Sequence, residues 1–184
     1  MKTATQNLED DHIHILRLID LMELITHNET VDIVHLETIV TIIREFADGQ
    51  HHAKEEQLLF PMLVEKGFST ENGPVAVMLH DHVQGREFVK GMAENIMQMK
   101  NGNHGAIQIV FANMTGYAAL LRSHIGKENN VLFRMADQVI SPAEQEQLLR
   151  EFEQIELGQN QDKSKIEYAA DIAGLEQYFG IIKS

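Results

Sequence analysis

The hydrophobic and polar positions of this chain follow a helical pattern almost throughout. Apolar side chains recur at intervals of three and four residues in long stretches rich in Leu, Ile, Met, Glu, Gln and Lys, which is the period of one helix face. Only three prolines occur, and no segment shows convincing strand-like alternation. We therefore expect helices over residues 6–27, 31–65, 74–100, 104–138, 142–157 and 164–181.

Short polar breaks separate the first four predicted helices. They fall at His27-Asn28, between Gly67 and Pro74, and at Asn101-Gly102-Asn103. Long amphipathic helices joined by short connections pack as antiparallel neighbours. The sequence therefore predicts an all-α fold, with an antiparallel up-down four-helix bundle over residues 1–140.

Residues 141–184 are expected to add two C-terminal helices. Ser141-Pro142-Ala143-Glu144 has the form of a capping box with proline at the first helical position, and Gly158 suits the end of that helix. The last helix carries an apolar stripe that we expect to cover the bundle or a partner, such as a second copy of the chain. The stripe consists of Ile166, Ala169, Ile172 or Ala173, and Tyr178 or Phe179.

A twelve-residue pattern in the second predicted helix returns in the fourth. Residues 51–62 correspond to residues 124–135, with His, Lys, Glu, Leu, Phe and Met matching in place. Asp11-His12-Ile13 precedes the first copy as Asp81-His82-Val83 precedes the second. Each half thus contributes one Asp-His pair and one His-x-x-x-Glu, and imidazole and carboxylate together suit a pair of metal ions.

Helical periodicity predicts which of these residues face inward. His51 and Glu55 share one face; its predicted stripe is Val40, Ile43 or Arg44, Ala47, Leu58 and Met62. The face of His52 carries Asp48, Glu45 and Thr41, so His52 and Glu56 are expected in solvent. Their counterparts in the repeat are Ile125 and Asn129, which cannot supply an imidazole or carboxylate ligand.

The same reasoning selects the remaining ligands. On the fourth helix the predicted stripe is Tyr117, Leu120 or Leu121, His124, Glu128, Val131 and Met135; His82 and His12 lie on comparable stripes. The predicted metal ligands are His12, His51, Glu55, His82, His124 and Glu128. His14 and His80 lie roughly 200° round the helix from the chosen histidines, although His14 shares a face with Leu18 and Leu21. The sequence leaves open whether His14, His52 or His80 adds a further ligand. His27, His35 and His104 are expected at the surface.

Each of these signals is weak when taken alone. A single inward histidine is usually a core residue with a hydrogen-bond partner, a lone His-x-x-x-Glu pair is common, and the Met and Phe residues are expected to be packing. Four inward histidines and two inward glutamates in a repeated register instead favour a metal site, because ionisable groups are rarely buried unpaired.

These residues make the chain similar to the hemerythrin-like family, the HHE cation-binding domains, from about residue 8 to residue 135. The strongest motifs are His51-His52-x-x-Glu55-Glu56-x-x-Leu59-Phe60-Pro61 and His124-Ile125-x-Lys127-Glu128. The resemblance implies a non-haem di-iron centre inside the bundle, with the four histidines as terminal ligands and Glu55 and Glu128 bridging two Fe ions. Mn or Zn would be substitutes.

Two departures from the oxygen-carrying hemerythrins change the expected function. Their third helix supplies two histidines one turn apart, whereas Met78 and Arg86 flank His82 here. They also place an aspartate five residues after the fourth-helix histidine, whereas Glu128 follows His124 at four. We therefore expect four histidines and a more open centre, which argues against simple oxygen carriage. The resemblance then favours sensors, proteins that handle peroxide or nitric oxide, and iron-centre repair proteins, although the last typically carry a further N-terminal domain with cysteine.

Three functions remain open at this point. The first is a protein that binds, senses or handles O2, NO or peroxide; the second is a peroxidase-like enzyme; the third is an iron-homeostasis or structural metal protein. A ferritin-like oxidase would need Glu-x-x-His on two helices, and only Glu9-x-x-His12 fits. Tyr117 either hydrogen-bonds a ligand at the centre or simply lines the bundle. Asp11 and Asp81 are expected to support the ligands from outside or to lie at the surface.

Composition narrows the class of partner and the compartment. A formal charge of −13 argues against nucleic acid and anionic membranes. The absence of cysteine excludes disulfides, iron–sulfur clusters and thiolate zinc sites, and suits a reducing compartment. The N-terminus lacks the apolar stretch of a signal peptide, and no stretch reaches the roughly 18 apolar residues of a spanning helix. We expect a cytoplasmic protein.

Overall fold

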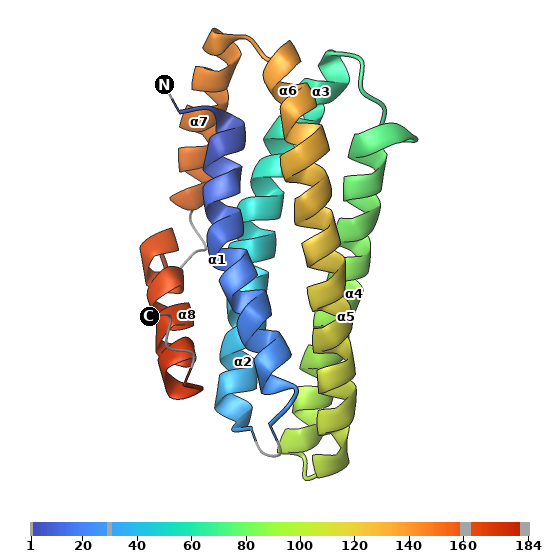
Figure 1. The fold of residues 1–184 in the computed structure, drawn as a ribbon, viewed down its shortest axis with the longest axis vertical. Coiled ribbons are helices and arrows are strands. Elements are labelled where there is room, and N and C mark those ends of the chain that lie inside the picture. Colours follow the sequence, from blue (N-terminus) through green and yellow to red (C-terminus); the bar gives the residue numbers. More distant parts are fainter. Residues whose placement is uncertain (1, 29–30, 159–162, 181–184) are drawn as a thin grey trace.

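Four long helical segments run side by side, alternately up and down (Figure 1). The computed structural model describes residues 2–28, 31–158 and 163–180, and within them it contains helices and no strand, which confirms the all-α fold. The first segment is α1 (Ala4–Ile25) and the third is α4 (Gly73–Lys100). The second segment consists of α2 (Ile33–Ile42), η1 (Ile43–His52), η2 (Glu55–Leu59) and α3 (Phe60–Glu65). The fourth consists of η3 (His104–Ala106), α5 (Ile107–Lys127), η4 (Glu128–Leu132) and α6 (Phe133–Val139).

The second and fourth segments contain π-helical stretches at the sequence repeat, in η1, η2 and η4. A π turn closes its hydrogen bond five residues apart, so it shifts the phase of every side chain that follows. The stripes expected downstream of the glutamates are therefore wrong. Val131 and Met135 are 48% and 37% exposed, and Leu58 and Met62 are only partly buried. The buried residues lie one position later: Leu59, Leu63, Leu132 and Ala136.

The apolar core is divided into two clusters by a buried polar layer. One cluster contains Ile19, Phe46 and Met114 among others, and the second contains Leu8, Leu59 and Phe133. On each of the four segments, the predicted ligands lie between residues of the first cluster and residues of the second. Such a layer in a bundle interior is costly unless its groups are paired or hold a cation.

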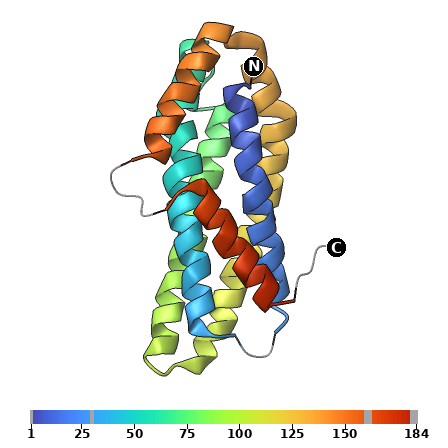
Figure 2. The ribbon, with the colours of Figure 1, turned by 90° about the vertical axis from the view of Figure 1, so that its left-hand side faces the viewer.

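Two further helices pack on one side of the bundle, α7 (Pro142–Glu156) and α8 (Lys165–Tyr178). The predicted capping box of α7 is present, with Ser141 and Glu144 bonded reciprocally. Helix α7 contacts α1 and η2, and α8 lies obliquely across α1 (Figure 2).

The buried face of α8 differs from the expected stripe. Ile172 is buried as expected, and Phe179 packs against the core, but Ile166 and Tyr178 are 80% and 66% exposed. The buried face instead includes two polar side chains that have partners: the Tyr168 hydroxyl donates to Glu45 Oε2 at 2.9 Å, and Glu176 pairs with Arg17. A stripe drawn from apolar residues alone misses such a face.

Candidate metal centre

The structure brings all six predicted ligands together and adds a seventh, His52. Two overlapping groups form, and within each group the candidate ligand atoms lie within 4.8 Å of one another. The first group is His12, His51, Glu55 and Glu128; the second is His52, Glu55, His82 and His124. All seven side chains are buried.

The position of His52 corrects the sequence analysis. It was expected in solvent, but it is 3% exposed. Since η1 is a π-helix, each turn holds more residues than an α turn, and adjacent residues diverge less around the axis. His51 and His52 therefore both face the interior. The overlooked signal was Ile125, the counterpart of His52 in the repeat: it is apolar and 3% exposed, which marks the position as an interior one.

The imidazoles meet through their Nε2 atoms. His12 Nε2 lies 3.1 Å from His51 Nε2, and His82 Nε2 lies 3.3 Å from His124 Nε2. Each glutamate lies between one histidine of either pair. The oxygen-to-Nε2 distances are 3.2 Å from Glu128 to both His12 and His124, and 3.8 and 3.4 Å from Glu55 to His51 and His82.

At its other ring nitrogen, Nδ1, every candidate histidine faces a polar protein group; the contact is a hydrogen bond for four of them and an ion-pair contact for His51. The five partners and distances are Asn129 at 2.8 Å for His12, Asp11 at 3.5 Å for His51, Asp48 at 3.2 Å for His52, Glu56 at 2.6 Å for His82, and Asp81 at 3.3 Å for His124. A partner at Nδ1 fixes the tautomer that leaves the Nε2 lone pair free, as in metal-bound histidine. Asp11 and Asp81 thus support the histidine of the following segment rather than the one beside them.

Several buried atoms of the layer accept no hydrogen bond from the described part of the chain. They are both carboxylate oxygens of Glu55, both of Glu128, and Nε2 of His52. A buried polar atom without a partner is costly, and these atoms converge on the same two groups. Nitrogen and oxygen donors in this arrangement fit iron, manganese or zinc.

Without a metal, protons occupy the centre. Burial alone lowers the pKa of His124, but Glu128 and Asp81 outweigh it and raise that pKa to about 10. The pKa values of His12 and His82 are raised against burial in the same way, by Glu128 and by Glu55 respectively. Metal binding must therefore displace protons from the imidazoles.

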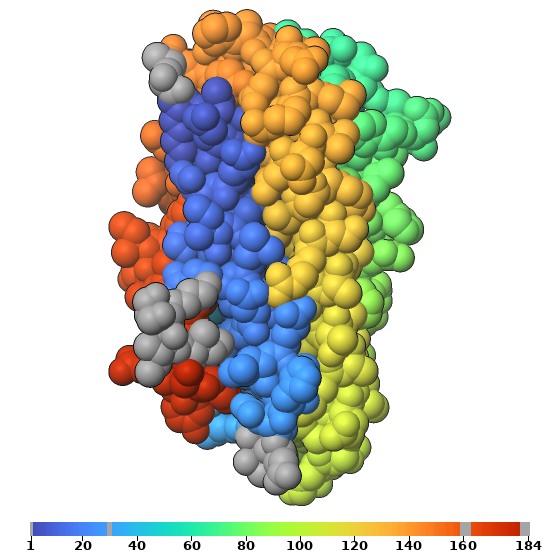
Figure 3. Space-filling model, in the orientation of Figure 1, coloured from blue at the N-terminus to red at the C-terminus, as the bar shows by residue number. Residues whose placement is uncertain are grey.

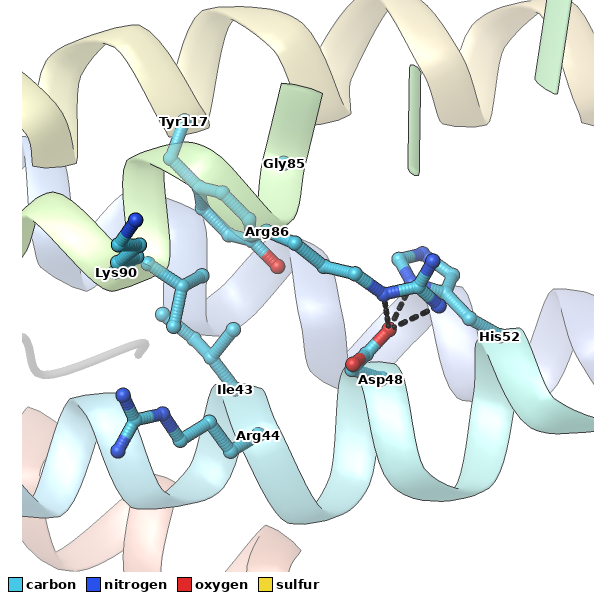
Figure 4. Close-up of a pocket in the computed structure, with 9 residues that line it drawn as sticks. Ile43, Arg44, Asp48, His52, Gly85, Arg86, Lys90 and Tyr117 are labelled. Carbon is cyan, nitrogen blue, oxygen red and sulfur yellow. Dashed lines mark hydrogen bonds and ion pairs between the residues drawn. The ribbon is translucent and has the colours of Figure 1, made fainter. Parts of the chain in front are cut away.

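Arg86 organises two of the ligands at once. It donates to Asp48 and Glu56 at 2.7 and 2.8 Å, and these carboxylates hold Nδ1 of His52 and His82. Figure 4 shows Asp48 between Arg86 and His52. In the oxygen carriers the third helix supplies two histidines one turn apart, and in this chain Arg86 occupies a position one turn after His82. Here a fifth imidazole, that of His52 on the second segment, lies among the candidate ligand atoms. The lack of a second third-helix histidine therefore does not by itself speak against oxygen carriage.

Tyr117 lies outside the ligand groups, in a cavity of about 130 Å³ on the outer side of His52 (Figure 4). The cavity is also lined by Ile43, Gly85 and Arg86. Tyr117 is 2% exposed, and burial together with the charge of Asp48 raises the pKa of its hydroxyl. The phenol therefore stays protonated and can donate a hydrogen bond into the cavity.

The remaining histidines lie away from the centre. His27, His80 and His104 are exposed, and His14 is half-buried beside Phe46. His35, expected at the surface, is partly covered because the end of α8 brings the rings of Tyr178 and Phe179 to 4.1 and 5.4 Å.

The family described as hemerythrin HHE cation binding domain matches residues 3–136. The chain belongs to this hemerythrin family. The match includes all seven residues of the centre and ends before α7 and α8. The C-terminal helices of this hemerythrin-like chain are thus additions to the matched region.

Curated relatives of this hemerythrin-like chain include proteins named iron-sulfur cluster repair protein YtfE. The protein from Yersinia pseudotuberculosis is 33% identical over 129 residues, covering 63% of this chain and 57% of that protein. Those from Musicola paradisiaca and Dickeya chrysanthemi are 32% and 28% identical, covering 57% and 56% of their lengths. The chain therefore matches little more than half of each relative. No solved structure matches it, and no helix among the described residues is long and apolar enough to cross a membrane.

Proposed function

We propose that this hemerythrin-like protein binds two iron ions and handles a small ligand, O2, NO or peroxide, at that centre. The observation that carries the proposal is that five imidazoles and two carboxylates converge in one buried layer. The oxygens of both carboxylates, those of Glu55 and Glu128, accept no hydrogen bond from the described residues. When bound, the two ions would supply open coordination positions and a change of oxidation state.

The donor set is unequal for the two ions. One ion would take His12 and His51, the other would take His52, His82 and His124, and Glu55 and Glu128 lie between them. The first ion would therefore have fewer protein donors, and we expect the small ligand there. The centre would remain suited to a small ligand because all seven side chains are buried.

The protein around the centre would control access to it. On the face shown in Figure 3, the side chains of α1 and α5 meet along the bundle. The cavity beside His52 instead opens between the second segment and α4, with the Tyr117 hydroxyl as a donor inside it. The cavity ends against His52, so it borders the three-histidine side of the centre, and Arg86 and Asp48 form its exposed wall.

Repair of iron centres is a second candidate, favoured by the names of the relatives. This sequence has no cysteine, so its own residues would contribute iron and small-ligand chemistry rather than thiolate chemistry. We retain the cytoplasm as the proposed location, since a chain without cysteine suits a reducing compartment.

Titration of the anaerobically iron-loaded protein with NO, O2 and peroxide, followed by absorption spectroscopy, tests the function. A stoichiometric adduct with one ligand supports binding or sensing, and catalytic decay of peroxide supports the peroxidase-like alternative. If none of the three changes the spectrum, the small-ligand proposal is wrong and a structural or storage role takes its place.

A further inference from the structure

Helices α7 and α8 meet a buried ionic cluster behind the ligand His51. Asp11 Oδ2 lies 3.5 Å from His51 Nδ1 and 2.8 Å from Lys54 Nζ, and the side chain of Asp11 is 0% exposed. Lys165, the first residue of α8, pairs with the other oxygen of Asp11. Glu156, the last residue of α7, pairs with Lys54. Both added helices therefore contribute a charge to the group that supports one ligand.

The sequence repeat provides a comparison within the same fold. Asp81, His124 and Lys127 repeat the arrangement of Asp11, His51 and Lys54 on the other half of the bundle. There no residue of α7 or α8 joins the described contacts, and the side chain of Lys127 is 38% exposed, whereas that of Lys54 is 1% exposed. The C-terminal helices thus cover Lys54 and add one charge of each sign to one of two equivalent supports.

The charges of this cluster balance as two lysines against two carboxylates. A lysine lies at each carboxylate oxygen of Asp11, with Lys54 at Oδ2 and Lys165 at Oδ1. Asp11 is therefore ionised, and its charge is shared between the lysines and the Nδ1–H of His51. In a buried site, a change in the charge of Lys54 or Lys165 therefore alters the electrostatic attraction between Asp11 and His51.

We propose that Lys165 and Glu156 are positioning residues that set, in opposite directions, how strongly the Asp11 carboxylate attracts the Nδ1–H of His51, which lies 3.5 Å away. Lys165 partly neutralises Asp11 and so weakens the attraction of Asp11 for His51. Glu156 draws Lys54 away from Asp11 and so leaves more charge for His51. The partner at Nδ1 sets the basicity of a metal-bound histidine and so its affinity for the metal. The C-terminal helices would therefore change the affinity for the ion held by His12 and His51, and leave the affinity for the other ion unaffected. This inference rests on the proposed metal centre.

The test is the proton resonance of His51 Nδ1–H in zinc-loaded protein, which is diamagnetic and requires no redox chemistry. Lys165→Met should move this resonance downfield, because Asp11 is then less neutralised. Glu156→Gln should move it upfield. The His124 Nδ1–H resonance serves as the internal reference and should stay in place in both variants. Lys163→Met is the matched control, since Lys163 loses the same charge two residues away but pairs with Asp171 instead.

The possible results separate this inference from the metal assignment. If both variants lower the unfolding temperature but leave the His51 resonance unchanged, or shift it in the same direction, Lys165 and Glu156 only fasten the helices and the inference is wrong. If the unaltered protein takes up no zinc, the metal centre itself is wrong. A shift of equal size in Lys163→Met would also overturn the inference, because general surface charge would explain it.

Discussion

At the scale of single residues, the ligands differ in how their Nδ1 atoms are held. His12 has a neutral amide partner, His82 a carboxylate shared with Arg86, and His51 a carboxylate inside a buried ionic cluster. Such partners control both the orientation and the basicity of a metal-bound imidazole, and losing one typically lowers metal affinity by roughly 10–100-fold. The centre can therefore be weakened from positions that never touch a metal.

Replacing His52 with Ala tests the ligand that periodicity did not predict. The variant should bind zinc more weakly at one of two metal sites, because the second group then keeps only His82 and His124 as imidazoles. The loss should be at least as large as the roughly 10–100-fold that follows removal of a hydrogen-bond partner of a ligand. Zinc titration by calorimetry measures this. His14→Ala is the control, since His14 is half-buried but outside both groups. Two sites of unchanged affinity in His52→Ala would show that His52 is not a ligand.

Arg86→Met should weaken the same site without removing a ligand. Asp48 and Glu56 would lose the guanidinium that fixes them, so His52 and His82 would be less well oriented. We expect a loss of roughly 10–100-fold in zinc affinity. Arg122→Met is a matched control, because Arg122 is 40% exposed beside the 42% of Arg86 and also bridges two carboxylates, Asp20 and Glu23. Equal effects of the two variants would point to net charge instead.

At the scale of helices, the π-helical stretches separate what the sequence predicted from what it did not. The four segments, the capping box at Ser141 and the convergence of the six predicted ligands follow from α-helical period and the repeat, because a spacing of four residues lies on nearly the same face in an α turn and in a π turn. His52 and the stripes beyond Glu55 and Glu128 were missed, because an α period cannot be extended through a π turn. The apolar residue Ile125 was the available clue.

Adjacent residues Val131 and Leu132 test the phase shift in η4. Leu132 is 0% exposed and should cost about 2–5 kcal/mol in the free energy of unfolding when replaced by Ala. Val131 is 48% exposed, and its replacement by Ala should change that free energy by less than about 0.5 kcal/mol. Urea denaturation of the metal-free protein measures both. A larger loss in the free energy of unfolding for Val131→Ala than for Leu132→Ala would contradict the phase shift and support the α-helical stripe.

At the scale of the whole molecule, the polar layer separates two apolar clusters that would otherwise form one continuous core. The fold therefore depends on how that layer is neutralised, by protons in the metal-free protein and by cations in the loaded protein. The C-terminal helices take part in this balance through the cluster at Asp11. Metal binding and folding should accordingly be coupled.

The coupling has a definite dependence on pH. Histidines whose pKa is raised in the folded state stabilise the metal-free protein fully below pH about 6.5, and that contribution is lost as the pH rises through the folded value, about 10 for His124. Metal binding requires neutral imidazoles and becomes stronger over the same range. The difference in melting temperature between zinc-loaded and metal-free protein should therefore widen from pH 6.5 to pH 9, as calorimetry would show. A difference that narrows would mean that the layer carries no such protons.

The most direct measurement is the metal content of protein reconstituted anaerobically with Fe(II) and freed of loosely bound ions. A centre built from five imidazoles and two shared glutamates predicts about two iron ions per chain, falling in the variant Glu55→Ala, which removes the residue common to both groups. Retention of no iron, or of a single ion that Glu55→Ala leaves in place, would contradict the two-metal centre.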